Sequence, residues 1–340
     1  MARKKAKLSN KAIIIITVLV IVILVALITY LAVTDQLDDV LDMLSSSFGG
    51  NDTDDTVKGD FFGTIDGDVL VKVHFVNVGQ GDAIVVELPE DKYMVIDAGS
   101  GTSVDSEMKD AYYNYLDSVI DGDKIDYLVA THPDSDHVNM LSGVLERYDV
   151  GKIYYNDYDK ASKTYQTFMD NAEKETDDRV VISNANDSYY DLQVGACNLR
   201  FYSAGNDGFP QEGTQANEMS IMCLLSYGGR KLLLTGDATD GTEEWFIEYT
   251  ARENMNVDFL KVGHHGSAGS SSNAFLDYID AEYGIICVDE NDNGYGHPTE
   301  AALSRLNAHN VKLYRTDLNG NVILTLDSDG DYQFAYDKAS

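Results

Sequence analysis

The chain has 340 residues, 44% of them hydrophobic, so it is neither a disordered nor a collagen-like chain. Asp and Glu number 57 against 25 Lys and Arg, which gives a formal net charge of −32. Five basic residues lie in residues 1–11 and no acid precedes Asp35, so the rest of the chain carries 20 basic and 57 acidic residues. This composition argues against a protein that holds nucleic acid in a broad basic groove.

An apolar segment over residues 12–33 follows the basic tail of residues 1–11 and contains no charged residue. As a helix it would be about 33 Å long, enough to span the ~30 Å hydrocarbon layer of a membrane. A secretory signal peptide has a shorter apolar stretch and a small-residue cleavage site. The segment therefore predicts a transmembrane anchor, with the N-terminus in the cytoplasm and the remainder of the chain outside.

Residues 34–68 are rich in Ser, Gly and acids, and this predicts an acidic flexible stalk. From residue 69 to 340, β-rich runs alternate with helical segments, which predicts one α/β domain with two sheets between layers of helices. Strands are expected near 69–78, 83–88, 93–99, 125–132, 152–157, 197–203, 219–227, 230–235, 257–263, 283–289 and 311–316. Helices are expected near 106–120, 138–148, 161–175, 241–251, 273–280 and 299–308, and hairpin turns at 318–321 and 328–331.

The three cysteines are far apart and form no Cys-x-x-Cys pair, which excludes a zinc-ribbon or thioredoxin-type site. Cys223 and Cys287 lie inside apolar runs. We expect buried free thiols without a catalytic role.

The densest group of chemically reactive side chains directly follows the predicted strand over 125–132. His132, Asp134, Asp136 and His137 place four candidate metal ligands within six residues. Without a cation these side chains would repel one another or change protonation, whereas a metal requires neutral imidazole and ionised oxygen. A solvated acidic turn would explain Asp134 alone but not the whole group.

Further candidates follow other predicted strands. His264 and His265 come before Gly-Ser at the end of one strand, Asp237 ends the strand Leu-Leu-Thr-Gly-Asp, and His297 precedes a proline. His74 and His309 stand alone, and we expect both to be structural.

These residues carry a resemblance. His-x-Asp-x-Asp-His resembles the His-x-His-x-Asp-His signature of the metallo-β-lactamase superfamily. The segments VNVGQGDAIVV, THPDSDH, NEMSIMCLL, LLTGD, LKVGHHGS and GYGHP, in this order over residues 69–336, resemble the hydrolase domains of ComEC-type DNA-uptake proteins. Asp97 matches the first family motif and Asp237 the bridging aspartate. The resemblance implies a metallo-β-lactamase-like αββα sandwich. It does not extend to a multi-helix membrane channel, because the sequence contains one apolar spanning segment.

The resemblance implies one or two divalent metal ions, zinc or manganese. Asp134 replaces the second histidine of the signature. No histidine lies between His137 and His264, and Asn217 and Ser220 stand in the matching mid-chain segment. Either histidine of the 264–265 pair could be the ligand; we assign His265 to the metal and His264 to the substrate. The implied metal ligands are His132, Asp134 and Asp237 for the first ion, and Asp136, His137, Asp237 and His265 for the second.

The implied activity is metal-assisted hydrolysis of a phosphodiester outside the cytoplasm, in nucleic acid or a cell-envelope polymer, without a nucleotide cofactor. Two alternatives remain: a hydrolase of teichoic-acid or choline-type phosphoesters, and a binding protein that has lost turnover, which the altered first metal site favours. Lys261 could contact a phosphate of the substrate, although a salt bridge within the protein is the more ordinary role of such a lysine. The implied catalytic residues are Asp136, His264 and His297, and the implied substrate-binding residues are Asn217, Ser220, Lys261 and Ser267.

Overall fold

The structure is a computed structural model that describes residues 58–62, 65, 70–156, 158, 162–182, 189–204, 216–250, 255–289 and 294–338. The predicted anchor over residues 12–33 and most of the predicted stalk lie outside these residues. Within the described ranges, no helix combines the length and the apolar character that a membrane span requires.

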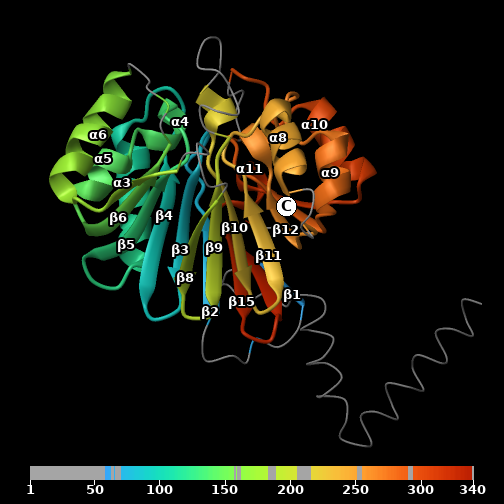
Figure 1. Cartoon of the computed structure of the whole chain (residues 1–340), viewed down its shortest axis with the longest axis horizontal. Coiled ribbons are helices and arrows are strands. Elements are labelled where there is room, and N and C mark those ends of the chain that lie inside the picture. The colour runs from blue at the N-terminus through green and yellow to red at the C-terminus, as the bar shows by residue number, and fades with distance from the viewer. Residues whose placement is uncertain are drawn as a thin grey trace, which may run out of the picture. The chain divides into compact units, whose positions relative to one another are not determined.

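The described strands form two mixed sheets, shown in Figure 1. The first has nine strands in the order β1-β16-β15-β2-β3-β4-β5-β6-β7. The segment Lys58–Phe62 was expected to belong to the stalk, but it forms β1 and pairs antiparallel with β16. The other bounds in this sheet are β2 (Leu70–Phe75), β3 (Ala83–Leu88), β4 (Lys92–Ala98), β5 (Lys124–Ala130), β6 (Asp149–Tyr155), β7 (Arg179–Val181), β15 (Val322–Asp327) and β16 (Tyr332–Tyr336).

The second sheet has seven strands in the order β14-β13-β12-β11-β10-β9-β8. Its strands β11 to β14 are parallel, as are β4 to β7 in the first sheet. The bounds are β8 (Tyr190–Val194), β9 (Cys197–Tyr202), β10 (Met222–Tyr227), β11 (Arg230–Leu234), β12 (Phe259–Lys261), β13 (Tyr283–Ile286) and β14 (Lys312–Arg315).

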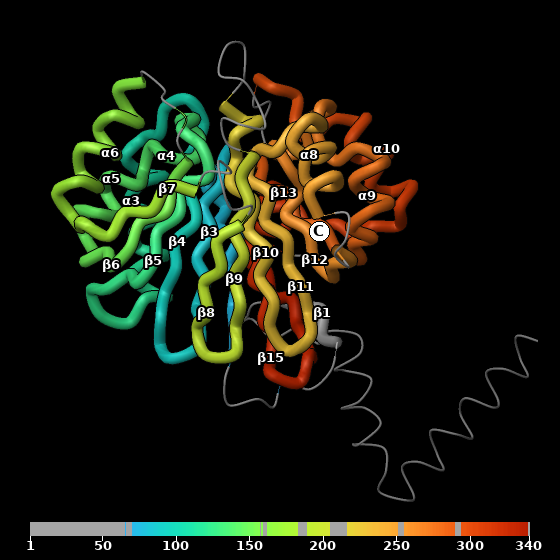
Figure 2. Tube along the Cα trace, in the orientation of Figure 1, coloured from blue at the N-terminus to red at the C-terminus, as the bar shows by residue number. Residues whose placement is uncertain are grey.

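Helices cover the outer face of each sheet (Figure 2). Tyr112, Tyr113 and Leu116 of α3 follow helical spacing and pack on the first sheet, and Asp105 caps that helix by accepting a hydrogen bond from the Met108 amide. The helices over the first sheet are α3 (Ser106–Val119), α5 (Leu141–Leu145) and α6 (Lys163–Glu175). Those over the second are α8 (Asp240–Thr250), α9 (Asn273–Ile279) and α10 (Glu300–Ala308).

The main core lies between the two sheets. Along β2, Val71, Val73 and Phe75 alternate with polar residues and face this core, as the two-residue period of a strand requires. Cys197, Cys223 and Cys287 are buried there as free thiols, which confirms their predicted burial. The fold is thus an αββα sandwich, as predicted.

Two predicted local structures differ. The helix expected over 138–148 is replaced by α4 (Ser135–Val138) and α5, because the Met140 amide donates to Ala98 O at the end of β4 instead of continuing a helix. The hairpin turn expected at 318–321 is wrong: Thr316–Asn319 form the short helix α11, which links β14 in one sheet to β15 in the other. The turn at 328–331 does join the antiparallel pair β15 and β16.

Candidate metal centre

The candidate ligands lie where parallel strands end. Asp97 is the last residue but one of β4, and the segment 131–137 follows β5. The segment 235–237 follows β11, and the 3-10 helix Gly263–Gly266 (η2) follows β12. Side chains beyond the carboxyl ends of neighbouring parallel strands converge on one edge of an open sheet. Here both sheets contribute to that edge.

Four of these side chains form one cluster. Asp136, His137, Asp237 and His265 each offer a ligand atom, and these atoms all lie within 4.8 Å of one another. Asp237 Oδ1 is 3.1 Å from His137 Nε2 and 3.4 Å from His265 Nε2. The same His265 nitrogen is 3.5 Å from Asp136 Oδ2.

The residues fit a divalent metal. His137 Nε2, His265 Nε2 and Asp237 Oδ1 are buried and have no hydrogen-bond partner in the described part of the chain. Buried polar atoms almost always have partners, so three such atoms facing one point require an explanation. Ligands about 2.1 Å from a tetrahedral metal stand about 3.4 Å from one another, which matches the separations in this cluster.

The carboxylates are held ionised, as metal ligands must be. In the metal-free chain burial raises the pKa of Asp136, but the nearby imidazole of His265 and the positive charges of His137 and His265 outweigh burial and lower the pKa to about 2. Burial likewise opposes ionisation of Asp237, yet His265 and His137 hold its pKa well below the ordinary value.

Hydrogen bonds behind the cluster orient both histidines. His137 Nδ1 donates to Asp97 Oδ2 at 2.7 Å, and His265 Nδ1 donates to the Cys287 carbonyl at 2.8 Å. Because both partners only accept, each Nδ1 carries a proton, and in the neutral ring each Nε2 presents its lone pair to the cluster. Asp97 is itself held by the Thr131 amide and hydroxyl, at 2.8 and 2.6 Å.

The second oxygen of Asp237 faces the predicted first metal position. Asp237 Oδ2 lies 3.9 Å from His132 Nε2 and 3.7 Å from His264 Nε2. The His132 nitrogen is buried without a hydrogen-bond partner among the described residues. Neither His132 nor Asp134 belongs to a group of three close ligand atoms in the described ranges. The geometry therefore favours the second predicted ion over the first.

The pair of adjacent histidines divides between two environments. His265 is 1% exposed and belongs to the cluster, whereas the His264 side chain is 27% exposed at its edge. Asn217 Nδ2 lies 3.2 Å from His264 Nε2, and the His297 ring lies 5.3 Å from the His264 ring. Asn217, His264 and His297 thus lie together beside the cluster.

Three of the predicted substrate-binding residues make contacts within the protein, close to the metal cluster. Lys261 is fully buried and its ammonium is 2.9 Å from Asp82, so it faces the interior instead of the edge; its salt bridge replaces the expected phosphate contact. Ser220, also fully buried, accepts a hydrogen bond from the Asp237 amide at 3.1 Å. The Ser267 amide donates to the His264 carbonyl and closes the turn of η2.

Sequence reasoning missed Asp82. Its amide donates to Asp136 O and its carbonyl accepts from the Gly99 amide, both at 3.0 Å. Asp82 therefore joins the segment 131–137 to the end of β4. A Cβ on Gly99 would overlap the backbone of Asp136 and His137, and one on Gly81 would overlap Asp136 O. The acid that follows Gly-Gln-Gly between two predicted strands was the available signal.

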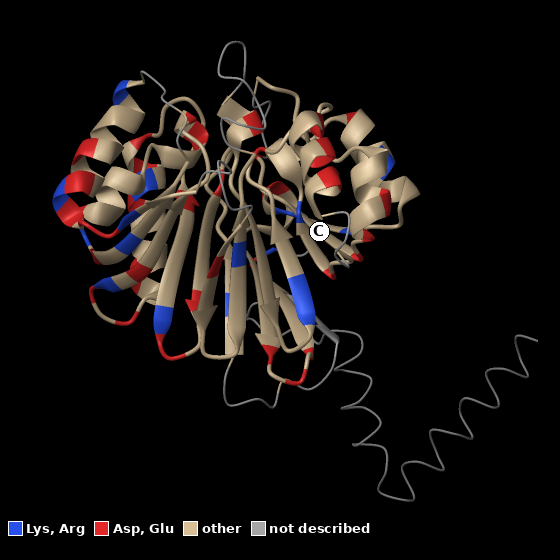
Figure 3. Ribbon diagram, viewed as in Figure 1, with Lys and Arg blue, Asp and Glu red and all other residues tan. Residues whose placement is uncertain are grey.

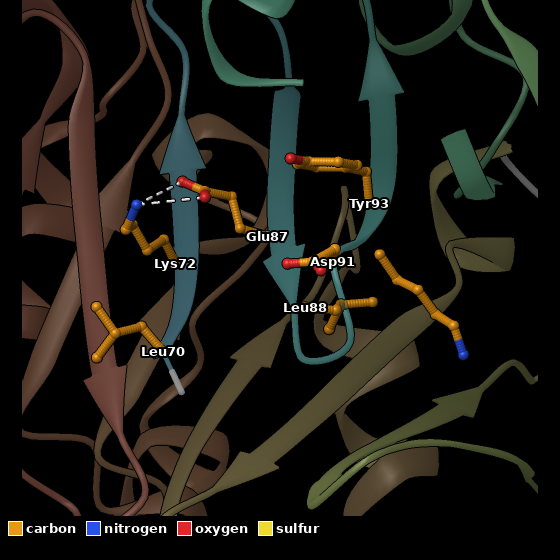
Figure 4. Close-up of a pocket in the computed structure, with 7 residues that line it drawn as sticks. Leu70, Lys72, Glu87, Leu88, Asp91 and Tyr93 are labelled. Carbon is orange, nitrogen blue, oxygen red and sulfur yellow. Dashed lines mark hydrogen bonds and ion pairs between the residues drawn. The ribbon is translucent and has the colours of Figure 1, made fainter. Parts of the chain in front are cut away.

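A hollow of about 200 Å³ lies at the start of β2 and β4 and the end of β3 (Figure 4). Its Lys72 ammonium bonds both oxygens of Glu87, at 3.0 and 3.2 Å. The metal cluster lies near the opposite ends of these strands, about 20 Å away at the rise of a strand. His74 also bonds Glu87, at 2.9 Å, and this contact agrees with the structural role expected for it.

Comparison with solved structures supports the fold. YhfI from Bacillus subtilis, described as a metallo-beta-lactamase fold protein, superposes with a TM-score of 0.50 at 12% identity. The superposition covers 76% of this chain and all of YhfI. At this identity the likeness concerns the fold alone.

Sequence comparison assigns the family. ComE operon protein 3 of Bacillus subtilis is 28% identical over 262 residues, which are 74% of this chain and 32% of that protein. Recombination protein 2 of Haemophilus influenzae is 26% identical over 252 residues, 74% of this chain and 28% of that protein. The chain therefore matches about a third or less of each relative's length. A family model described as the metallo-beta-lactamase superfamily matches residues 76–289. The chain belongs to the metallo-β-lactamase superfamily and is homologous to these two proteins.

Proposed function

We propose that the chain is a metal-dependent phosphodiesterase anchored in the cell membrane with its folded domain outside the cytoplasm. The observation that carries the proposal is the group of buried ligand atoms on His137, His265 and Asp237, which have no hydrogen-bond partner among the described residues. A divalent metal held by Asp136, His137, Asp237 and His265 would supply an activated water and positive charge against phosphoryl oxygens.

The open side of the cluster is bounded by Asp136 and His264. Their side chains are 20% and 27% exposed, whereas those of His137, Asp237 and His265 are at most 2% exposed. A substrate therefore approaches over Asp136 and His264. The ionised Asp136 carboxylate can accept a hydrogen bond from the attacking water and orient it.

His264 and His297 act as neutral imidazoles in this proposal. Burial and the neighbouring histidines lower the pKa of His297 to about 4, and burial is also the main cause that lowers the pKa of His264. At neutral pH each ring keeps one N–H to donate to a phosphoryl oxygen, but neither holds a second proton for the leaving group. We assign both residues to charge stabilisation.

The membrane location rests on the sequence, in which a basic tail precedes the uncharged segment 12–33 and acids follow it. Two reporter enzymes can be fused after residue 340, one that is active only outside the cytoplasm and one that is active only inside it. We expect activity from the first alone. Activity of a cytoplasm-specific reporter at this position would contradict the topology.

The activity is tested with the full-length chain in detergent, stripped of metal and reloaded with zinc or manganese. We expect hydrolysis of bis-p-nitrophenyl phosphate that depends on the added metal. DNA and teichoic acid, offered as competing substrates, then decide between a nuclease and a cell-envelope hydrolase. If the chain binds metal but hydrolyses none of these substrates, it is a binding protein instead. The 3.9 Å between His132 Nε2 and Asp237 Oδ2, at the first predicted metal position, would agree with that result.

A further inference from the structure

A second group of close ligand atoms, two from acids and one from a histidine, lies directly behind the metal centre. Asp82, Asp97 and His137 offer ligand atoms within 4.8 Å of one another, and all three side chains are buried. This cluster already contains a cation, because Lys261 Nζ lies 2.9 Å from Asp82 Oδ2. The same ammonium donates to the Val262 carbonyl at 2.8 Å.

Stability alone does not account for such a pair. Lys261 is 0% exposed and Asp82 is 1% exposed, so both charges have lost their hydration. Replacing a buried ion pair by apolar residues of similar volume is often neutral or stabilising. A role for the pair should therefore be sought in what it touches.

The pair touches the back of both histidine ligands. Asp82 Oδ1 lies 3.5 Å from His265 Nδ1, and Asp82 Oδ2 lies 4.0 Å from His137 Nδ1. His265 also has a left-handed backbone, with φ of 52°, in a loop where His264 has φ of 48°. A non-glycine residue in this region is held there by its surroundings.

We propose that Lys261 and Asp82 are positioning residues of the metal centre: the buried ammonium fixes Asp82 behind His265, so that His265 Nε2 stays aimed at the metal. Asp82 adds a negative charge on the Nδ1 side of the imidazole, which strengthens Nε2 as a ligand. Lys261 balances this charge, and through the Val262 carbonyl it also ties the carboxylate to the strand end that precedes η2. The proposal rests on the metal centre of the proposed function but not on its substrate.

The test is a Co²⁺ titration of the full-length chain in detergent, followed by the visible absorption of bound cobalt and by thermal unfolding of the metal-free protein. The variants are Lys261→Met, Asp82→Asn, and the double variant that removes both charges together. Lys312→Met is the matched control, because its side chain is 59% exposed on β14, with its ammonium on Glu282.

Lys261→Met leaves a buried carboxylate without its cation, so we expect a lower melting temperature of the metal-free protein. The double variant removes that unpaired charge, and its melting temperature should return toward the wild-type value. Its Co²⁺ affinity should nonetheless stay about 10–100-fold below wild type, with an altered cobalt spectrum, because the support behind His265 is still missing. Asp82→Asn alone should show the same loss of affinity, and Lys312→Met should match wild type.

A double variant that binds Co²⁺ with wild-type affinity and spectrum would overturn the proposal and leave the pair a structural role only. If neither variant of Lys261 folds, Asp82→Asn decides by the same two readouts. Failure of the wild-type chain to bind Co²⁺ would instead contradict the metal centre, so failures of the two proposals are distinguishable.

Discussion

Asp97 and His137, forty positions apart in the chain, share a hydrogen bond of 2.7 Å between Asp97 Oδ2 and His137 Nδ1. Asp97 has a left-handed backbone, with φ of 56°, and its two oxygens are also held by Thr131. The contact fixes the tautomer of His137 and turns Nε2 toward Asp237.

Asp97→Asn should therefore weaken metal binding by about 10–100-fold, because an amide cannot accept from both Thr131 and His137 with two oxygens. Asparagine tolerates the left-handed backbone, so the fold should persist. Metal titration of the purified chain checks this, with the exposed Asp121→Asn as control. Wild-type affinity in Asp97→Asn would contradict the orienting role.

Asp136→Ala and Asp237→Ala should each reduce phosphodiester hydrolysis by more than about 100-fold and should lower the bound metal content, because each removes a predicted ligand. His309→Ala is the matched control. His309 bonds the Arg305 carbonyl at the end of α10 and the exposed Asp277, and its loss should be nearly silent. Either aspartate variant with normal activity and metal content would remove that residue from the ligand set.

Metal binding should weaken as the pH falls. Burial opposes protonation of His137 and His265, but carboxylates, Asp237 foremost, raise the pKa of both rings above the ordinary value. In the metal-free chain the protonated rings stabilise the folded state. This stabilisation is complete below about pH 6.5, the ordinary pKa of histidine, and it is lost as the pH rises through the raised pKa of the folded state. A metal requires the deprotonated rings, so it competes best at high pH.

The rise in melting temperature caused by saturating zinc should thus increase between pH 6 and pH 8.5. Thermal unfolding with and without zinc measures it across this range. A rise that stays constant, or that is largest at pH 6, would contradict the placement of the metal on His137 and His265.

DNA cleavage, if it occurs, should be unchanged or faster when salt increases from low to physiological concentration. The chain beyond residue 34 carries 20 basic and 57 acidic residues. In the view of Figure 3, Lys and Arg are scattered over helices and strands of the described domain. Salt screens repulsion between this acidic surface and DNA over about 8 Å, whereas a basic surface would lose affinity with salt. Tight DNA binding at low salt with a steep loss at higher salt would contradict this prediction.

The sequence predicted the residues that the structure brings together in the candidate metal centre, because each group follows a strand and is local in the chain. Asp136 and His137 needed only their spacing, and the αββα layers followed from the alternation of strands and helices. The supports could not be predicted in this way, because Asp82 pairs with Lys261 only after both sheets have assembled. Lys261 was considered as a phosphate contact, but in the structure it is buried and its charge pairs with Asp82. Gly99, likewise, is required by the backbone of Asp136, a contact that no local pattern encodes.

The most direct test of the account is anomalous diffraction at the zinc absorption edge from crystals of the zinc-loaded protein. We predict a peak within about 2.3 Å of His137 Nε2, His265 Nε2 and an oxygen of Asp237, with Asp136 completing the site. A peak among Asp82, Asp97 and Lys261, or zinc held only by residues outside this cluster, would contradict it.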